Sequence, residues 1–345
     1  MSKNKYNVVV LIGRFQPVHN AHIELLRKAS EMADKVVIVV GSAHQPRTFK
    51  NPFTSSERET MIQRAIDKLC SLTTRFYVEH NIDTIYNNTA WATRVQSLVA
   101  KHSAPGDKIA IIGHEKDETS FYLSMFPQWD REEVDLIEPL HATDVRDLFF
   151  QADFNIKFLQ GVVPETTIEF LQKFSKTEDF LQVVREREFI TNYKKQFASL
   201  PYPPIFVTSD AVVIQSGHVL MVKRRSEPGR GLWALPGGFV NAHTDASVED
   251  AAIRELKEET GIKVPVPVLR GNIKASRVFD AVNRSARGRT ITHAFSIVLP
   301  DGPLPKVKGS DDAEKACWVP INDVRTDQCF EDHYEIVSWA IGGVS

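Results

Sequence analysis

Two histidines stand three residues apart where the first apolar segment of the chain ends, and they can act on phosphates. Residues 8–12 are apolar and lead to Gly13, and Arg14, His19 and His22 follow. The amide groups and the dipole at a helix N-terminus attract anions. Two imidazoles and a guanidinium there can bind a triphosphate and stabilise charge on a leaving pyrophosphate. Neither histidine has to be a nucleophile, because an acceptor phosphate is already anionic and positioning supplies most of the rate.

Three glutamates on one predicted helix form a second candidate site. Glu255, Glu258 and Glu259 are three and four residues apart, so they share a helical face. Carboxylates this close repel one another unless a cation lies between them. Mg²⁺ prefers oxygen ligands and keeps waters or substrate phosphates in its other positions. The sequence Leu-Pro-Gly-Gly at 235–238 and Gly261 flank the helix, and together they predict metal-assisted hydrolysis of a pyrophosphate. An exposed acidic face is the alternative, but it would not require the flanking glycines.

The first constellation resembles the signature GxFxPxHxxH of the nucleotidyltransferase family. Five residues match its fixed positions: Gly13, Phe15, Pro17, His19 and His22. The resemblance implies that Gly13, Arg14 and Phe15 lie against the nucleotide and that both histidines are catalytic. A solvated or metal-binding histidine pair is the alternative, and it would not require the other three residues in register.

Later segments resemble loops of the nicotinamide-mononucleotide adenylyltransferases. These segments are residues 41–58, 86–91, 113–117 and 141–146. The resemblance implies that Arg47 holds the acceptor phosphate, that Trp91 stacks on the nicotinamide ring, and that Arg146 is a catalytic phosphate contact. Four more residues are implied to lie near the substrates: Gly113, Lys116, Asp117 and Thr143. The alternatives are a core tryptophan, a solvated arginine and an ordinary turn at 116–117. His141 and Ala142 stand where the wider family commonly has serines.

The acidic helix resembles the box of the Nudix hydrolases, with one departure. The resemblance implies four metal-binding groups: the carbonyl of Gly237 and the carboxylates of Glu255, Glu258 and Glu259. Counting back from Arg254, the first glutamate of the box falls on Ala246, and the loop after Gly238 is two residues longer than the pattern. That glutamate often steadies the arginine rather than binding metal, and Asp245 or Glu249 are candidates for its role.

Residues 278–295 resemble a stretch in Nudix domains that are fused to these adenylyltransferases, among which members hydrolyse ADP-ribose to AMP and ribose 5-phosphate. Three arginines are implied to grip the diphosphate: Arg284, Arg287 and Arg289. An exposed basic hairpin is the alternative. Asp311, Asp312 and Glu314 lie where Nudix enzymes often carry a further catalytic acid. The sequence neither chooses among them nor excludes a solvated acidic loop.

The elements that must position these residues change character along the chain. Over residues 6–150, short β-rich runs alternate with helical patterns, which predicts an α/β, Rossmann-like domain with a doubly wound parallel sheet and its ligands at the carboxyl ends of the strands. Strands are expected at 7–13, 36–40, 76–79, 109–113 and 135–137. Helices are expected from Ile23 to Ala33, from Thr54 to Leu69, and around 91–100, 144–150 and 247–259.

Polar helices and a proline-rich stop separate two domains. Residues 201–204 read Pro-Tyr-Pro-Pro, a boundary signal. We therefore predict a nucleotidyltransferase domain at 1–164, a helical linker at 165–203 and an α+β Nudix domain, or a mixed sheet flanked by helices, at 204–345. The length of 345 residues suits two or three domains.

Composition narrows the partners to small molecules. The formal net charge of −2 gives no reason to expect nucleic acid or a membrane surface. The N-terminus lacks the features of a signal peptide, and the three cysteines have no metal-ligand spacing, so a reducing cytoplasm is expected. The sequence leaves the oligomeric state open, a homo-oligomer included.

The sequence thus predicts a bifunctional enzyme. Its first half would make NAD from ATP and nicotinamide mononucleotide, and its second half would hydrolyse ADP-ribose, each with Mg²⁺ or, in its place, Mn²⁺. Two alternatives stay open at this stage. The second half could be a non-catalytic module that senses ADP-ribose or NAD, because its box is altered at Ala246. The acceptor could be nicotinate mononucleotide or phosphopantetheine, although the loops at Arg47 and Trp91 favour a pyridine nucleotide.

Overall fold

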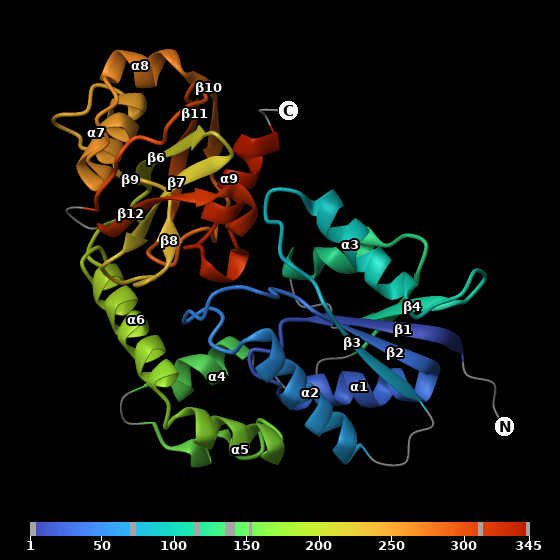
Figure 1. Cartoon of the computed structure of the whole chain (residues 1–345). Coiled ribbons are helices and arrows are strands. Elements are labelled where there is room, and N and C mark those ends of the chain that lie inside the picture. The colour runs from blue at the N-terminus through green and yellow to red at the C-terminus, as the bar shows by residue number, and fades with distance from the viewer. Residues whose placement is uncertain are drawn as a thin grey trace. The chain divides into compact units, whose positions relative to one another are not determined.

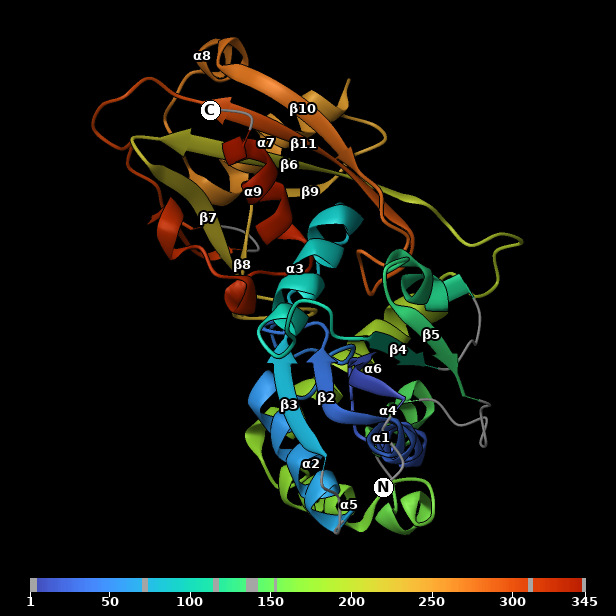
Figure 2. The ribbon, with the colours of Figure 1, turned by 90° about the vertical axis from the view of Figure 1, so that its right-hand side faces the viewer.

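The chain folds into two compact units, residues 1–184 and 185–345. The computed structural model describes residues 5–69, 74–113, 118–134, 142–151, 154–309 and 313–342. Figures 1 and 2 show a sheet with helices in each unit. No described helix is long and apolar enough to span a membrane.

The first unit is built on a parallel sheet of five strands in the order β3-β2-β1-β4-β5 (Figure 1). The strands are β1 Tyr6–Gly13, β2 Ala33–Val40, β3 Arg75–His80, β4 Ile109–Gly113 and β5 Asp130–Glu133. Every pairing between them is parallel. The order reverses between β2 and β4 on either side of β1, so the end of β1 lies at the switch point where such sheets bind ligands. The predicted α/β class is confirmed.

Alternation along β1 and β2 divides the core into two layers. Val9, Leu11, Val36 and Ile38 join a cluster with residues of the helices on one face. Val8, Val10, Val37 and Val39 join a second cluster, which includes Leu98 of α3, on the other face. Successive side chains of a strand point to opposite faces, so a strand that is apolar throughout needs cover on both.

The helices of this unit begin close to the predicted positions. They are α1 Asn20–Met32, α2 Ser55–Lys68, α3 Asn88–Ala100, α4 Ala142–Phe149 and α5 Glu165–Phe174, with the 3₁₀ turns Glu118–Met125 and Ile156–Leu159. Thr54 caps α2, and its hydroxyl accepts a hydrogen bond from the amide of Glu57, as the capping box predicted. Ala33 differs from the prediction, because it begins β2 and does not end α1. The predicted strand 135–137 lies outside the described residues.

The predicted linker is not a separate connector. Phe174 at the end of α5 is 4% exposed and Val183 of α6 Glu178–Lys195 is 1% exposed, and both belong to the core cluster of the first unit. The ring of Phe174 lies near those of Phe53, Phe149 and Phe180. The many Lys and Glu residues suggested a helical linker, but most of them lie on the exposed faces of these helices, with Glu186 buried, and the apolar residues pack into the core. The boundary between the units falls inside α6.

The second unit contains a mixed sheet in the order β10-β11-β6-β7-β12. Its strands are β6 Phe206–Gln215, β7 His218–Arg224, β8 Trp233–Ala234, β9 Gly237–Phe239, β10 Ile273–Phe279, β11 Thr290–Val298 and β12 Ala313–Pro320. Strand β6 pairs in parallel with β11 and antiparallel with β7 and β9. The predicted mixed sheet flanked by helices is confirmed.

Three helices complete the second unit: α7 Val248–Thr260, α8 Val266–Gly271 and α9 His333–Gly342. Helix α7 begins at Ser247, whose hydroxyl caps the amide of Asp250 at 3.1 Å. It ends at Gly261, which has a φ of +58°, a left-handed conformation that favours glycine. Helices α7 and α9 lie on opposite sides of the sheet (Figures 1 and 2).

Replacing Phe174 with alanine tests whether α5 belongs to the first unit. We expect Phe174→Ala to lower the free energy of unfolding of that unit by about 3–5 kcal/mol, because it empties an aromatic core. Phe158→Ala, at a phenylalanine that is 67% exposed, is the matched control and should cost less than about 1 kcal/mol. Urea denaturation measures both. Equal losses would contradict the assignment.

Candidate functional site

The turn from β1 into α1 brings both predicted histidines together. Their rings lie 3.8 Å apart between centroids at the start of α1. The backbone amide of His19 donates to Nδ1 of His22 at 3.2 Å. When the ring of His22 is neutral, this bond assigns its proton to Nε2. The imidazole of His22 is therefore oriented as an Nε2 donor, which suits a phosphate oxygen.

Phe15 shapes this turn from inside the core. Its ring is 1% exposed and lies 4.6 Å from the ring of His22. A Cβ atom on Gly13 would lie 3.1 Å from the phenyl ring, so the glycine leaves room for Phe15. The buried ring of Phe15 packs beside His22, so a contact of Phe15 with the nucleotide stays a prediction and would be made by its backbone. Arg14 beside it is exposed, as a ligand contact requires.

Arg146 is held against the same turn. It lies in α4 and is 5% exposed, and it donates to the carbonyl of Gln16 at 2.7 Å and to the hydroxyl of Thr143 at 3.0 Å. Burial lowers its pKa to about 10, and the positive charge of Arg14 adds to the effect. The guanidinium still carries its charge at neutral pH. The structure thus assembles Arg14, Arg146 and the histidines at the end of β1.

Arg58 is a positioning residue that the sequence reasoning missed. Its side chain is 1% exposed and donates to the carbonyls of Arg14 at 2.8 Å, Gly41 at 2.6 Å and Ser42 at 3.0 Å. These bonds join the turns that follow β1 and β2. Burial lowers its pKa to about 10. The sequence offered one signal for this role, because Arg58 stands in the first turn of the helix that follows the predicted acceptor loop.

The structure does not support the predicted phosphate contact of Arg47. Its guanidinium binds Glu57 at 2.9 Å and Asp179 at 3.0 Å, and its side chain is 14% exposed. It also lies 5.2 Å from the ring centroid of Phe174. These partners already satisfy the charge, so the contact with an acceptor phosphate would require them to release it. The sequence predicted a phosphate contact, with a solvated loop charge as the alternative, and it did not reveal these two carboxylates as partners.

Trp91 keeps its predicted place at the start of α3. It is partly buried, and its ring lies 6.3 Å from Tyr122 and 6.2 Å from Phe126. Gly113 ends β4 and is buried; a Cβ there would lie 2.9 Å from Leu123, which explains the glycine without a ligand. Three further predicted positions lie outside the described residues: Lys116, Asp117 and His141.

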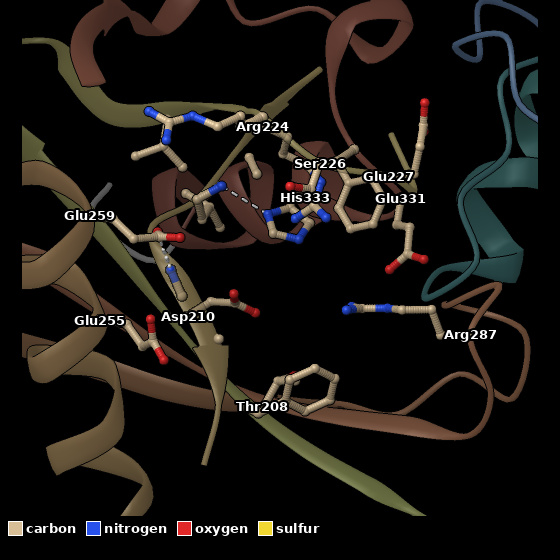
Figure 3. A pocket seen from close by; sticks show the side chains of 18 of the residues that line it. Thr208, Asp210, Arg224, Ser226, Glu227, Glu255, Glu259, Arg287, Glu331 and His333 are labelled. Atoms are coloured by element: carbon tan, nitrogen blue, oxygen red, sulfur yellow. Dashed lines mark hydrogen bonds between the residues drawn. The ribbon is translucent and has the colours of Figure 1, made fainter. Parts of the chain in front are cut away.

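The second unit holds a cavity of about 570 Å³ between β6, β9, α7 and the turn before α9 (Figure 3). Glu255 and Glu259 of α7 lie on one side, and Arg287 and Glu331 lie across from them. Glu258 does not line the cavity. Two of the three predicted acids therefore face the same space.

These two acids differ in their surroundings, because Glu255 is partly buried and pairs with Arg254 at 2.8 Å, while Glu259 is buried. The amide of Gly237 donates to Glu259 at 3.0 Å, and a Cβ on Gly238 would lie 2.5 Å from the carboxylate of Glu255. Burial raises the pKa of Glu259 to about 8, and the charges of Glu255 and Asp210 raise it further. Burial also raises the pKa of Glu255. Such a pair fits a divalent cation, which would compensate both charges.

Glu258 lies outside the cavity lining, and its metal-binding role stays a prediction. It is 48% exposed on its side chain and accepts a hydrogen bond from Arg254 at 2.9 Å. Among the described residues, no three His, Cys, Asp or Glu side chains are grouped closely enough to hold a metal by themselves. The contact between Gly237 and Glu259 is a hydrogen bond from the backbone amide of the glycine. Waters or substrate phosphates would therefore complete the coordination of a bound ion.

Asp245 takes the place of the missing glutamate of the box. Its carboxylate accepts two hydrogen bonds from Arg254, both at 2.8 Å, and its side chain is 3% exposed. The bonds from Arg254 hold the pKa of Asp245 at about 2. Glu249, the other candidate, lies 3.5 Å from Arg270 instead. The two extra residues of the loop bring Asp245 to the arginine that Ala246 cannot bind.

The three predicted arginines have different surroundings. Arg284 forms a buried bidentate pair with Asp332, at 2.7 and 2.8 Å. Arg289 donates to the carbonyl of Asp280 and does not line the cavity. Arg287 lines the cavity and lies 5.1 Å from the ring centroid of Phe239. The three-arginine grip stays a prediction; in this structure Arg289 lies outside the cavity lining, and Arg284 would have to share its charge with Asp332.

The turn before α9 supplies residues that the sequence did not single out. The amide of Leu235 donates to Nδ1 of His333 at 2.8 Å, and burial lowers the pKa of this histidine, so its neutral ring carries a proton on Nε2 (Figure 3). Glu331 also lines the cavity, and burial raises its pKa. The predicted acid Glu314 is exposed and lies outside the cavity lining, while Asp311 and Asp312 lie outside the described residues.

Two family models match the chain in separate segments. The model for the NUDIX domain matches residues 205–340, and the model described as cytidylyltransferase-like matches residues 10–132. A nicotinamide/nicotinic acid mononucleotide adenylyltransferase of Acinetobacter baylyi is 35% identical over 180 residues, which are 52% of this chain and 92% of that protein. A nicotinamide-nucleotide adenylyltransferase of Thermococcus onnurineus is 31% identical over 169 residues, 49% of this chain and 84% of that protein.

A solved structure matches both units at once. It is a bifunctional NMN adenylyltransferase/ADP ribose pyrophosphatase from Francisella tularensis, complexed with AMP and a manganese ion. Its TM-score is 0.90 at 34% sequence identity, and the match covers 99% of this chain and 100% of that one. The likeness therefore extends through α5 and α6, which neither family model includes.

The contact between Asp245 and Arg254 predicts a dependence of stability on pH. The pKa of Asp245 is about 2 when folded and about 4 when unfolded, so its contribution is complete above pH 4 and is lost as the pH falls toward 2. We expect Asp245→Asn to lower the free energy of unfolding by about 1–2 kcal/mol at pH 6. The difference from the parent chain should shrink below pH 4.

Urea denaturation of the full chain between pH 3 and pH 6 measures this difference. Glu249→Gln is the control, because the pair of Glu249 with Arg270 is exposed and should contribute less than about 0.5 kcal/mol. Identical pH profiles for the two variants would show that Asp245 has no special role.

Proposed function

The chain belongs to the family of bifunctional NMN adenylyltransferase/ADP-ribose pyrophosphatases, and we propose that it makes NAD in its first unit and hydrolyses ADP-ribose in its second. The observation that carries the proposal is the presence, in one chain, of two sites with opposite charge. One is a cationic helix start at His19 and Arg146. The other is a cavity lined by two carboxylates, the partly buried Glu255 and the buried Glu259.

In the first unit, a phosphate oxygen of the mononucleotide attacks the α-phosphorus of ATP. A new P–O bond forms, the bond to the β-phosphate breaks, and pyrophosphate leaves. His19, His22 and Arg146 hold the phosphates and stabilise the charge that grows on the leaving group. The pair His19–His22 lies at the N-terminus of α1, where backbone amides add to the positive field. The reaction needs no protein nucleophile.

We propose nicotinamide mononucleotide as the acceptor, with Trp91 as the platform for its ring. The partly buried indole at the start of α3 supports this role. We leave Arg47 out of the proposed site, because its guanidinium is already bound by Glu57 and Asp179. An aromatic platform binds the amide and the acid ring equally well, so the comparison of nicotinamide and nicotinate mononucleotide turnover decides between them.

In the second unit, water cleaves the diphosphate of ADP-ribose and gives AMP and ribose 5-phosphate. Glu255 and Glu259 would hold Mg²⁺, or Mn²⁺ in its place, which polarises the diphosphate when bound. Arg254 keeps Glu255 in position at 2.8 Å and is itself held by Asp245. Arg287 and the Nε2 proton of His333 are the donors available to the substrate phosphates in the cavity. The intact support of Arg254 favours hydrolysis over a purely sensing role.

The proposed partners of the protein are its small-molecule substrates. ATP, nicotinamide mononucleotide and ADP-ribose are small, anionic and soluble, and we propose the cytoplasm as the compartment. The thiols of Cys317 and Cys329 are unbonded in the described structure, which agrees with a reducing environment.

Replacing His19 tests the first activity. We expect His19→Ala to lower the rate of NAD formation from ATP and nicotinamide mononucleotide by about 10²–10³-fold, since it removes a preorganised phosphate contact. Hydrolysis of ADP-ribose by the same variant should stay unchanged. Coupled spectrophotometric assay of NAD measures the first activity. A variant with normal NAD formation would refute the proposed role of His19.

Replacing Glu259 tests the second activity. Glutamine keeps the size of the side chain and can still accept the hydrogen bond from Gly237, so the fold should be preserved. We expect Glu259→Gln to lower AMP release from ADP-ribose at least about 100-fold, because it removes a metal-binding charge. Its NAD formation is the internal control. If the parent chain releases no AMP with Mg²⁺ or Mn²⁺, the proposed hydrolase activity is wrong.

A further inference from the structure

The side chain of Gln16 joins two segments that are far apart in the sequence. Gln16 follows Arg14 and Phe15 in the turn after β1, and it is 0% exposed. Its Nε2 donates to the carbonyl of Phe53 at 2.9 Å, and its Oε1 accepts from the amide of Phe53 at 3.0 Å. These two bonds engage both polar ends of the carboxamide with one residue. Phe53 directly precedes Thr54, the cap of α2, so the pair ties the turn to the start of that helix.

The backbone of the same turn is held at two further points. The carbonyl of Gln16 accepts from Arg146 of α4 at 2.7 Å, and the carbonyl of Arg14 accepts from Arg58 of α2 at 2.8 Å. Phe15 stands between these two carbonyls and has a φ of +53°, a conformation that residues other than glycine rarely adopt. Such a conformation persists only where surrounding contacts enforce it. The bonds from α2, α4 and Phe53 supply those contacts.

Packing alone does not require a carboxamide at this position. An apolar side chain of the same length would fill the same space, and Phe53 is already packed against the rings of Phe170 and Phe174, with centroids 5.5 and 5.2 Å away. The reciprocal bonds of Gln16 add direction, because they fix both the distance and the angle between the turn and Phe53. A buried polar network that is fully satisfied makes one arrangement rigid in this way.

We propose that Gln16 is a positioning residue for adenylyl transfer, which keeps the phosphate-binding turn and Arg146 in a fixed relation without touching a substrate. The inference rests on the proposed synthesis of NAD in the first unit. His19 and His22 follow the turn directly, and Arg146 is bonded to it. A shift of the turn would therefore move the phosphate contacts relative to one another. Fixed geometry supplies much of the rate of a phosphoryl transfer.

Replacement of Gln16 in the full chain tests this role. Methionine keeps the length of the side chain and removes both hydrogen bonds. We expect Gln16→Met to lower the kcat of NAD formation about 100-fold, the effect of a displacement of about 1 Å at a reacting centre. The KM values of ATP and nicotinamide mononucleotide should stay within about threefold of the parent values, since the loss falls on the transition state. Gln16→Glu loses only the donor, so its kcat should fall about tenfold.

A double variant distinguishes positioning from a general loss of stability. Because Gln16 acts through the turn that Arg146 binds, the two effects should not be additive, and Gln16→Met should cost less than about tenfold in kcat when Arg146→Ala is already present. Leu171→Ala is the matched control, because Leu171 of α5 is 0% exposed in the core of the same unit and makes no contribution to the turn in the proposal. It should destabilise the unit and leave kcat within about twofold of the parent value. Urea denaturation shows which variants are folded under the assay conditions.

Three results would each overturn the role of Gln16: a normal kcat in Gln16→Met, an equal loss in Leu171→Ala, or additive losses with Arg146→Ala. If Gln16→Met does not fold, Gln16→Glu carries the same comparisons, and an unchanged kcat in that variant would overturn the role. A parent chain that forms no dinucleotide from either mononucleotide would refute the proposed transferase activity, and the role of Gln16 with it.

Discussion

Both candidate sites depend on buried charges that the protein itself leaves partly uncompensated. In the first unit, Arg58 and Arg146 are almost fully buried and donate hydrogen bonds to carbonyl and hydroxyl oxygens. In the second unit, Glu255 and Glu259 face one cavity; Arg254 pairs with Glu255, while Glu259 accepts its hydrogen bond from the neutral amide of Gly237. A buried charge without a counter-charge is costly. Each site therefore gains free energy from a ligand of opposite sign, phosphate in one case and a divalent cation in the other.

Neighbouring residues that need not touch a substrate hold these charged side chains in place. Arg58 binds the carbonyls at the ends of two adjacent strands, so the turns after β1 and β2 keep a fixed spacing. Asp245 binds Arg254 through both carboxylate oxygens, and Arg254 in turn contacts Glu255. Neither Arg58 nor Asp245 has to touch a substrate to matter. Rigid support of this kind is what precise positioning of phosphates requires.

Helix α6 shows how a segment can belong to two units. Its first residues pack into the core of the first unit at Val183, and its later residues line the cavity of the second at Tyr193. Its charged composition, with few clear apolar positions, suggested a linker. Its apolar residues are both aliphatic and aromatic, and a few of them, such as Val183, Ile190 and Tyr193, pack against the two units.

Sequence by itself determined the elements and the chemistry of both sites. Strands of continuous apolar residues, the cap at Thr54 and the spacing of His19 to His22 and of Glu255 to Glu259 are local patterns, and local patterns can be read without a fold. Partners distant in sequence could not be read in this way. Only the tertiary structure showed that Arg47 is bound by Glu57 and Asp179, that Phe15 is buried, and that Asp245 replaces the glutamate missing at 246. The physical reason is that the role of a charged or aromatic side chain depends on what packs against it, and the fold decides that contact.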